Sequence, residues 1–473
     1  MILRLLTQER ARPVRIRRWS GAGWLAVATV CLGAFMGQLD ASIVTLTYRP
    51  LGTEFNSSLA AVQWVSLAYL LTLATLLIPV GRLADARGRK LLYLHGFVVF
   101  TAASAACGLS TSLGMLIAFR VVQGIGAAML QANSVALVVT SAPHGRVRTA
   151  LGIQAAAQAI GLALGPTVGG VLVATLGWRW VFGINVPVGI LAIVAGVFFL
   201  PRSRSLIPLE GWDLPGVLLL TTATTSGLLG IAAVSGLGLP DWAPAVLLLL
   251  SATGVVGFIL RENYAAAPLL DPTLVRDRTI STGLLGALSS YLVLFGPLVL
   301  VPIVLTAAGS SELHAGLVLT ALPAGFALAA TTGARLLPTG WSNRRRASFG
   351  ATLALASLGA LIAVPLTATW LIPLLGILGV ALGIFTPANN TVVMLAIPAG
   401  AAGTGGGLLN MTRSLGTALG VALVTLALHL RPDGAGPLDG PRAAVTLLTL
   451  AAAVMLLSSR LQPEAHPSAP ATT

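Results

Sequence analysis

The chain alternates long apolar stretches with short polar segments throughout its length. Most of the stretches run for about 20 residues, which is the length that an α-helix needs to cross a bilayer. They are continuous rather than alternating with a period of two, so helices are favoured over a barrel. Hydrophobic residues make up 56% of the 473 residues and charged residues only 9%. The pattern therefore predicts an all-α polytopic membrane protein.

The apolar stretches predict fourteen transmembrane helices. We place them at residues 24–47, 59–80, 91–109, 113–140, 149–176, 179–200, 214–235, 243–260, 279–306, 314–337, 348–368, 371–397, 404–430 and 442–459. An even number of spans returns both termini to the same side of the membrane.

The basic residues indicate the orientation. Of the 28 Lys and Arg residues, 22 lie on the side of the N-terminus, four on the opposite side and two within spans. Cytoplasmic loops carry an excess of Lys and Arg, so both termini are expected to be cytoplasmic. The net charge of +14 thus reflects topology, and we expect no nucleic-acid partner.

An internal repeat divides the chain into two halves. The spacing of three glycines in the fifth span recurs in the thirteenth, at Gly152, Gly161 and Gly165 and at Gly407, Gly416 and Gly420. The offset implies that spans one to six recur as spans nine to fourteen. We therefore expect a basic cytoplasmic tail (1–23), an N-terminal six-helix bundle (24–200), a linker with an inserted transmembrane hairpin (201–278), a C-terminal six-helix bundle (279–459) and a cytoplasmic tail (460–473).

Residues 81–90, GRLADARGRK, form a charged island between the second and third spans, and we predict a tight loop there. The island resembles the signature loop of the major facilitator superfamily, with Gly81, Leu83, Asp85, Gly88, Arg89 and Lys90 at the defining positions. The resemblance implies the major facilitator fold, in which two six-helix pseudo-repeats surround a central cavity. It also implies a gating role for the loop, in which we include Arg87. The corresponding loop of the second half keeps arginines but no acid, so the gate is expected to be asymmetric.

Two further motifs resemble those of proton-coupled drug exporters. The fifth span carries a string of small residues and proline that resembles the motif of the superfamily's antiporters, formed by Gly161, Gly165, Pro166, Gly169 and Gly170. Small residues at this spacing let another helix pack closely. In the first span, the sequence around Asp40 resembles a motif of the fourteen-span drug:proton antiporters. These resemblances imply export rather than uptake.

Asp40 is the acidic residue that lies deepest inside a predicted span. A charged carboxylate at the bilayer centre costs about 2.5 to 3.5 kcal/mol on insertion scales, so we assign Asp40 to proton coupling. A purely structural ion pair is the alternative. Arg120 lies on a polar face of the fourth span, where it either tunes Asp40 and relays protons or holds helices together through carbonyl groups.

Polar and aromatic residues inside spans are candidates for the substrate cavity. They are Gln38, Gln63, Trp64, Tyr69, Gln123, Gln131, Gln154, Gln158, Tyr291, Asn390, Asn410 and Arg413. For Arg413, contact with an anionic part of the substrate and a structural role are both open.

These features together predict a proton-coupled antiporter that exports amphipathic organic compounds such as drugs or antibiotics by alternating access. A dedicated exporter of one specialised metabolite, a proton-coupled importer and a non-transporting receptor are the alternatives. The sequence contains no catalytic Ser/His/Asp cluster, metal-ligand grouping or phosphate-binding loop. We therefore expect no enzymatic activity, no metal and no cofactor, and we expect the proton gradient to drive transport. The resemblance to the superfamily also implies a monomer. The Arg-, Ala- and Gly-rich composition is typical of GC-rich bacterial genomes, so we expect the protein in the cytoplasmic membrane of a bacterium.

Overall fold

The computed structural model describes residues 9, 11–17, 19–57, 59–203, 206, 213–234, 239–265, 268–310, 312–338, 340–429 and 439–463, so part of the predicted N-terminal tail and most of the predicted C-terminal tail lie outside it. Its helices are α2 (Val14–Arg17), α3 (Ala22–Ile43), η1 (Val44–Thr47), α4 (Tyr48–Glu54), α5 (Leu59–Arg87), α6 (Arg89–Gly108), α7 (Leu113–Ser141), α8 (Val147–Thr175), α9 (Arg179–Gly183), α10 (Asn185–Phe199), α11 (Leu214–Val234), α12 (Ala243–Tyr264), α13 (Pro272–Arg276), α14 (Arg278–Ala307), α15 (Glu312–Leu319), α16 (Ala321–Leu336), α17 (Asn343–Ala363), α18 (Ala368–Ala396), η2 (Ala399–Ala401), α19 (Ala402–His429) and α20 (Asp439–Leu461).

The described residues contain eleven helices that are long and apolar enough to cross a membrane. The other three predicted spans coincide with α8, α11 and α19, which have 29, 21 and 28 residues. At about 1.5 Å per residue these helices are also long enough to cross a bilayer. The total of fourteen spans stays a prediction, whereas the all-helical architecture matches the expectation from the apolar stretches.

The charged island is not a loop, which corrects the prediction made for residues 81–90. Helix α5 continues to Arg87 and α6 begins at Arg89, so Gly88 alone separates them. Gly88 has a φ of 111°, a conformation that favours glycine. Asp85 near the end of α5 and Arg89 at the start of α6 form an ion pair at 2.8 Å across this break.

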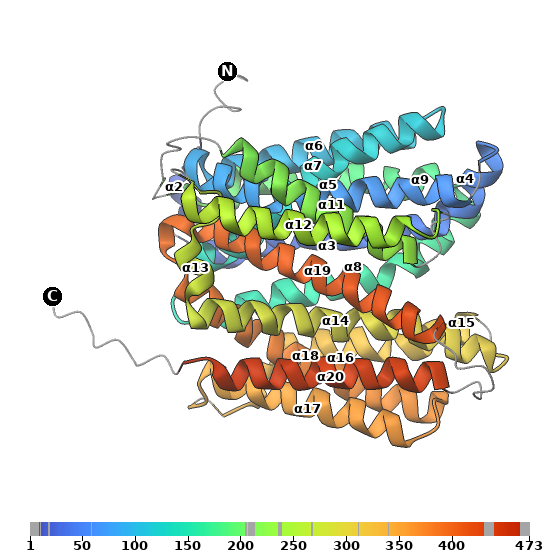
Figure 1. The fold of residues 1–473 in the computed structure, drawn as a ribbon. Helices are drawn as coiled ribbons and strands as arrows, with labels where there is room; N and C mark the ends of the chain where they lie inside the picture. Colours follow the sequence, from blue (N-terminus) through green and yellow to red (C-terminus); the bar gives the residue numbers. More distant parts are fainter. Residues whose placement is uncertain are drawn as a thin grey trace.

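The helices form two groups that lie alongside each other (Figure 1). In the N-terminal group α3 packs against α7, α8 and α10, and α7 packs against α5 and α6. In the C-terminal group α14 packs against α18, α19 and α20, while α17 packs against α18 and α20. The groups meet where α5 contacts α19, α8 contacts α16 and α7 contacts α19. Helices α11 and α12 pack against each other, and α11 also contacts α5.

The sequence repeat has a structural counterpart in helix packing. A Cβ at Gly161 of α8 would lie 2.6 Å from the Phe35 carbonyl oxygen of α3, and one at Gly416 of α19 would overlap the Leu288 carbonyl oxygen of α14. The equivalent glycines therefore let equivalent helix pairs approach closely in the two groups.

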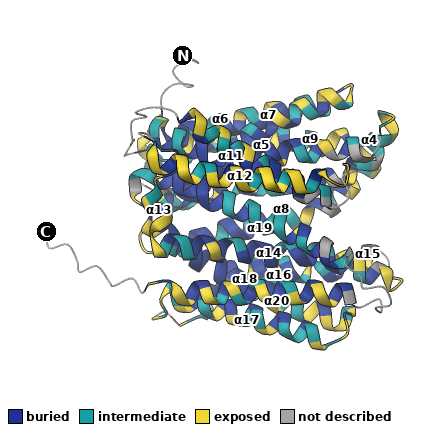
Figure 2. Cartoon of the chain, viewed as in Figure 1, coloured by how far each residue is buried: buried dark blue, intermediate teal, exposed yellow. Residues whose placement is uncertain are grey.

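Exposed residues lie along the outer helices of the bundle (Figure 2), and many of them are large apolar residues. On α12, for example, Leu249 is 66% exposed and Val256 is 56% exposed. An apolar surface of this extent fits lipid rather than water.

Candidate functional site

A fully buried ion pair joins α3 to α7 inside the N-terminal group. Asp40 and Arg120 are both 0% exposed, and Arg120 Nη1 donates to Asp40 Oδ2 at 2.6 Å. Arg120 Nε also donates to the Val65 carbonyl oxygen of α5 at 2.8 Å. Arg120 therefore makes both kinds of contact that the sequence leaves open, one to the carboxylate and one that ties helices together.

Two amides complete the hydrogen bonding of Asp40. Its Oδ1 accepts from Gln123 Nε2 at 2.9 Å and from Asn185 Nδ2 at 3.0 Å. Gln123 also accepts from Arg120 Nη1 at 2.7 Å and donates to Ser104 Oγ at 2.8 Å. A buried charge is tolerated when it is paired and hydrogen-bonded in this way. We call Asp40, Ser104, Arg120, Gln123 and Asn185 the Asp40 cluster.

Aromatic rings enclose the cationic side of the Asp40 cluster. The Arg120 Cζ atom lies 4.1 Å from the ring centroid of Tyr69 and 5.8 Å from that of Phe182. Arg120 is seven residues from the start of α7, so the pair lies roughly 10 Å inside that helix. The cluster therefore sits closer to the end of the bundle that carries α4 than to the end that carries Gly88.

Contacts at that end of the bundle position Asn185. Trp178 Nε1 donates to Glu54 Oε2 at 2.6 Å, and Arg179 Nη2 lies 2.8 Å from Glu54 Oε1. Hydrogen bonds from Arg179 and Trp178 lower the pKa of Glu54 because they stabilise its charged form. Only Ile184 separates α9 from α10, so anchoring α9 also fixes the start of α10. Asn185 was missed as a site residue, although it lies within the predicted span 179–200 and is the first residue of α10.

The antiporter-type motif of α8 packs directly on the helix that carries Asp40. A Cβ at Gly165 would overlap Ser42 Oγ, and a Cβ at Gly169 would lie 2.6 Å from Ile43. Gly170, in contrast, has no atom within 4 Å of that position. The Pro166 side chain lies outside the described residues. The motif thus brings α8 against residues that precede Asp40 in α3 and against residues that follow it.

The charged island connects the two groups of helices. Asp85 accepts from the backbone N–H groups of Gly403 and Thr404, at 2.7 Å each, and from Thr404 Oγ1 at 2.8 Å. Arg89 donates to the Gly400 carbonyl oxygen at 3.0 Å. A carboxylate is favourable at a helix N-terminus, which α19 presents here. These contacts hold α5 to α19.

The remaining island residues have different roles. Gly81 lets α5 approach the Gly403 carbonyl oxygen, to which a Cβ would lie 2.6 Å away. Lys90 Nζ donates to the carbonyl oxygens of Val197 and Leu200 at 2.9 Å each, which closes the end of α10. Arg87 is exposed.

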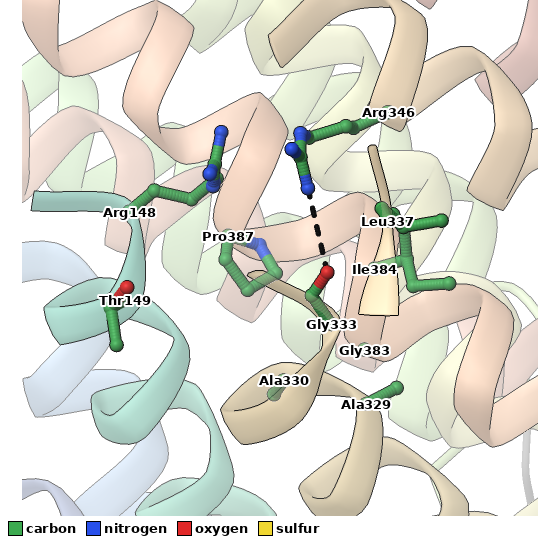
Figure 3. Close-up of a pocket in the computed structure, with 10 residues that line it drawn as sticks. All are labelled: Arg148, Thr149, Ala329, Ala330, Gly333, Leu337, Arg346, Gly383, Ile384 and Pro387. Atoms are coloured by element: carbon green, nitrogen blue, oxygen red, sulfur yellow. Dashed lines mark hydrogen bonds between the residues drawn. The ribbon is translucent and has the colours of Figure 1, made fainter. Parts of the chain in front are cut away.

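The equivalent junction in the other half lacks an acid. Arg148 of α8 and Arg346 of α17 line a cavity of about 20 Å³ together with Gly333 and Pro387 (Figure 3). Arg346 donates to the carbonyl oxygens of Pro338 and Trp341 at 2.6 and 3.2 Å. These bonds lie within the connection between α16 and α17, and α8 is joined to α17 by Arg148 Nη1, which donates to Asn343 Oδ1 at 3.2 Å, in place of a carboxylate cap.

A second polar group lies where the two halves meet. Asn410 Nδ2 of α19 donates to the Gln131 carbonyl oxygen of α7 at 2.5 Å. Tyr291 of α14 donates to Gln158 Oε1 of α8 at 3.3 Å. Arg413 lies with its Cζ atom 5.4 Å from the Tyr291 ring centroid. We call Gln131, Gln158, Tyr291, Asn410 and Arg413 the interface cluster.

The other cavity candidates lie in varied surroundings. Gln123 donates to Asp40, and the Tyr69 ring lies beside Arg120, so both belong to the surroundings of the buried ion pair. Gln154 and Asn390 are buried, and Gln154 Nε2 and Asn390 Oδ1 have no hydrogen-bond partner among the described residues. Gln38 is half-buried and Trp64 is 38% exposed. The Gln63 side chain lies outside the described residues.

Comparison with known protein families identifies the family of this chain. The family model of the Major Facilitator Superfamily matches residues 30–421. The chain belongs to this superfamily. The predicted family and fold class are therefore confirmed, and the protein is a multi-pass membrane transporter with homologues among bacterial transporters.

Several curated relatives are known for resistance or export. The chain is 30% identical to the tetracenomycin C resistance and export protein of Streptomyces glaucescens, over 87% of this chain and 77% of that protein. It is 32% identical to the methylenomycin A resistance protein of Bacillus subtilis, over 87% and 89%. It is also 31% identical to the riboflavin transporter RibZ of Clostridioides difficile, over 84% and 87%. These relatives are transporters rather than enzymes.

Among solved structures, the chain resembles the human organic anion transporter MFSD10 with a TM-score of 0.65. The match covers 93% of this chain and 99% of that one at 17% identity. At this identity the likeness shows the shared fold alone.

Proposed function

We propose that this transporter is a proton-coupled antiporter that exports amphipathic organic compounds, such as drugs or antibiotics, across the bacterial cytoplasmic membrane. The observation that carries the proposal is the buried pair between Asp40 of α3 and Arg120 of α7, with α3 packed against the glycine face of α8. The resistance and export relatives support the direction of transport.

Proton uptake at Asp40 supplies the coupling step. Protonation removes the negative charge that pairs with Arg120, while Arg120 keeps its hydrogen bond to the Val65 carbonyl oxygen. Breaking a buried pair by removing one partner typically costs about 3–5 kcal/mol, because the other charge stays buried. A cost of this size favours rearrangement of α3, α5 and α7 around the cluster.

Helix α8 transmits that rearrangement to the other half. One stretch of α8 packs on α3 near Asp40, and another contacts α16, where a Cβ at Gly152 would overlap the Ala330 carbonyl oxygen. A shift of α3 therefore moves a helix that forms the seam between the halves. Opening on the side predicted to be cytoplasmic also requires Asp85 to leave the N-terminus of α19.

A dedicated exporter of one specialised metabolite is the second candidate. It is favoured by relatives whose names each specify a single antibiotic, tetracenomycin C and methylenomycin A. A broad panel of compounds separates the two candidates, because a dedicated exporter responds to one structural class.

Proton movement in inverted membrane vesicles tests the proposal. An acid-sensitive dye follows the vesicle interior while amphipathic cations, neutral antibiotics and organic acids are added in turn. The proposal predicts substrate-triggered proton release with the wild-type protein and none with Asp40→Asn. Release that persists in Asp40→Asn contradicts the assignment of coupling to Asp40, and the absence of release for every transported compound contradicts antiport.

A further inference from the structure

Arg413 is a buried cation without a carboxylate partner among the described residues. It is 4% exposed, and it belongs to none of the ion pairs found there. Its Nη1 donates to Asn410 Oδ1 at 2.8 Å, whereas its Nε is buried and has no hydrogen-bond partner. One edge of the guanidinium therefore lacks an acceptor.

Both halves of the transporter contribute to the surroundings of Arg413. Asn410 reaches α7, and Tyr291, which lies beside the guanidinium, donates to Gln158 of α8. These neighbours are uncharged. Gln154 lies one turn from Gln158 on α8, and its buried Nε2 is a second donor without a partner. Arg413 of the interface cluster and the nearby residue Gln154 of α8 therefore each carry a buried donor without a partner among the described residues.

Acidic residues that could bind a cation are missing from the C-terminal half of this seam. From 278 to 429 the sequence contains one acidic residue, Glu312, at the first residue of α15. In the N-terminal half the Asp40 carboxylate is already occupied by Arg120, Gln123 and Asn185. The interface thus carries a positive charge and no free carboxylate to oppose it.

We propose that Arg413 binds an acidic group of the transported compound, so that the substrates are organic anions. The free edge of a guanidinium matches carboxylate oxygens in a bidentate geometry, and such charge-assisted hydrogen bonds are stronger than neutral ones. Occupation by an anion also satisfies the buried charge of Arg413. Lipophilic cations face the opposite electrostatics, because they would place like charge beside Arg413. The inference rests on the proposed export function and specifies its substrate class.

Binding to the purified full-length protein tests the inference without requiring transport. The probes are aromatic carboxylic acids, each compared with its primary amide and with an amine of the same length, for example 1-naphthaleneacetic acid, 1-naphthaleneacetamide and 2-(1-naphthyl)ethylamine. We expect the acids to bind at least tenfold more tightly than their amides to the wild type. Arg413→Gln should abolish this preference, while Arg345→Gln, at an exposed arginine, should leave it intact.

Arg413→Lys keeps the inference testable if Arg413→Gln fails to fold. Lysine retains the charge but loses the planar fork, so the preference for acids should shrink without disappearing. Equal or tighter binding of the amides or amines overturns the inference, as does an acid preference that survives Arg413→Gln or an absence of binding by every acid. Acids that bind but are not driven by a pH gradient contradict proton-coupled export alone, whereas amines driven by the gradient contradict the anion assignment alone.

Discussion

Asp85 of α5 and Thr404 of α19 are joined by two hydrogen bonds, 2.7 Å from the backbone N–H and 2.8 Å from the hydroxyl of Thr404. Hydrogen bonds to a charged group are worth about 1.5–3 kcal/mol each. This contact ties the N-terminal half to the C-terminal half through a carboxylate that caps α19. It therefore holds the two halves together at the end of the bundle that carries Gly88, and we call this contact the Asp85 lock.

Replacing Asp85 with Asn should loosen that lock. The amide lacks the charge that the N-terminus of α19 favours, so the open state should gain population by about tenfold or more, since 1.4 kcal/mol corresponds to a factor of ten. The measurement is the rate at which a thiol reagent labels Ala132→Cys, next to the close approach of Gly406, in a protein without Cys31 and Cys107. Asp241→Asn, at an exposed position, is the control. Equal labelling rates in the two variants would contradict the lock.

The two glycines of the α8 motif offer a matched comparison. Gly165→Ala should destabilise the protein by about 1–3 kcal/mol, because the added Cβ overlaps Ser42 and forces α3 and α8 apart. Gly170→Ala meets open space and should be close to neutral. The melting temperatures of the two purified variants check this difference. Similar melting temperatures would contradict the close contact between α3 and α8 at Gly165.

A double-mutant cycle separates the buried ion pair from its surroundings. Asp40→Asn and Arg120→Met should each lower the free energy of unfolding by about 3–5 kcal/mol, because each leaves the charge of the other residue buried and unpaired. The double variant should lose less than the sum of the two. Glu54→Gln breaks the exposed Arg179–Glu54 pair, whose side chains are 43% and 39% exposed, and should cost at most about 1 kcal/mol. Additive losses at Asp40 and Arg120 would mean that the pair contributes no coupling energy.

The anion inference has an electrical consequence. Exchange of one proton for one monovalent anion moves two positive charges inward, and each charge is worth about 3.5 kcal/mol at ~150 mV. A membrane potential without a pH gradient should therefore drive export of an organic acid in inverted vesicles. Export of an uncharged amide moves only one charge, so the same potential should supply about half as much free energy to it. Export of the acid that is indifferent to an imposed potassium-diffusion potential would contradict this stoichiometry.

The sequence predicts the helices well because hydropathy and span length are local properties. The predicted span 113–140 differs from α7 by one residue at one end, and the predicted span 279–306 differs from α14 by one residue at each end. The island at residues 81–90 was predicted wrongly, since polarity alone does not distinguish a loop from polar helix ends joined by a single glycine. The contacts of Asp85 with Arg89 and with α19, which is more than 300 residues away in sequence, cannot be read from local polarity.

The Asp40 cluster was only partly predictable for a related reason. Helical periodicity places Asp40, Arg120 and Gln123 on polar faces, but it does not say which faces meet. The contacts of Asn185 and Ser104 depend on how α10 and α6 pack around α3 and α7. The same uncertainty in helix rotation made Gln123 a candidate for the substrate cavity, whereas in the structure it donates to Asp40.

The role of Asp40 in proton coupling is tested most directly by comparing two modes of transport in Asp40→Asn vesicles. Once a transported compound has been found, its exchange between the two sides needs alternating access but no net proton movement, whereas its accumulation needs the proton gradient. The account predicts that Asp40→Asn retains exchange at a substantial fraction of the wild-type rate and loses gradient-driven accumulation. Accumulation that persists in this variant, with the same dependence on the pH gradient as in the wild type, would contradict the account.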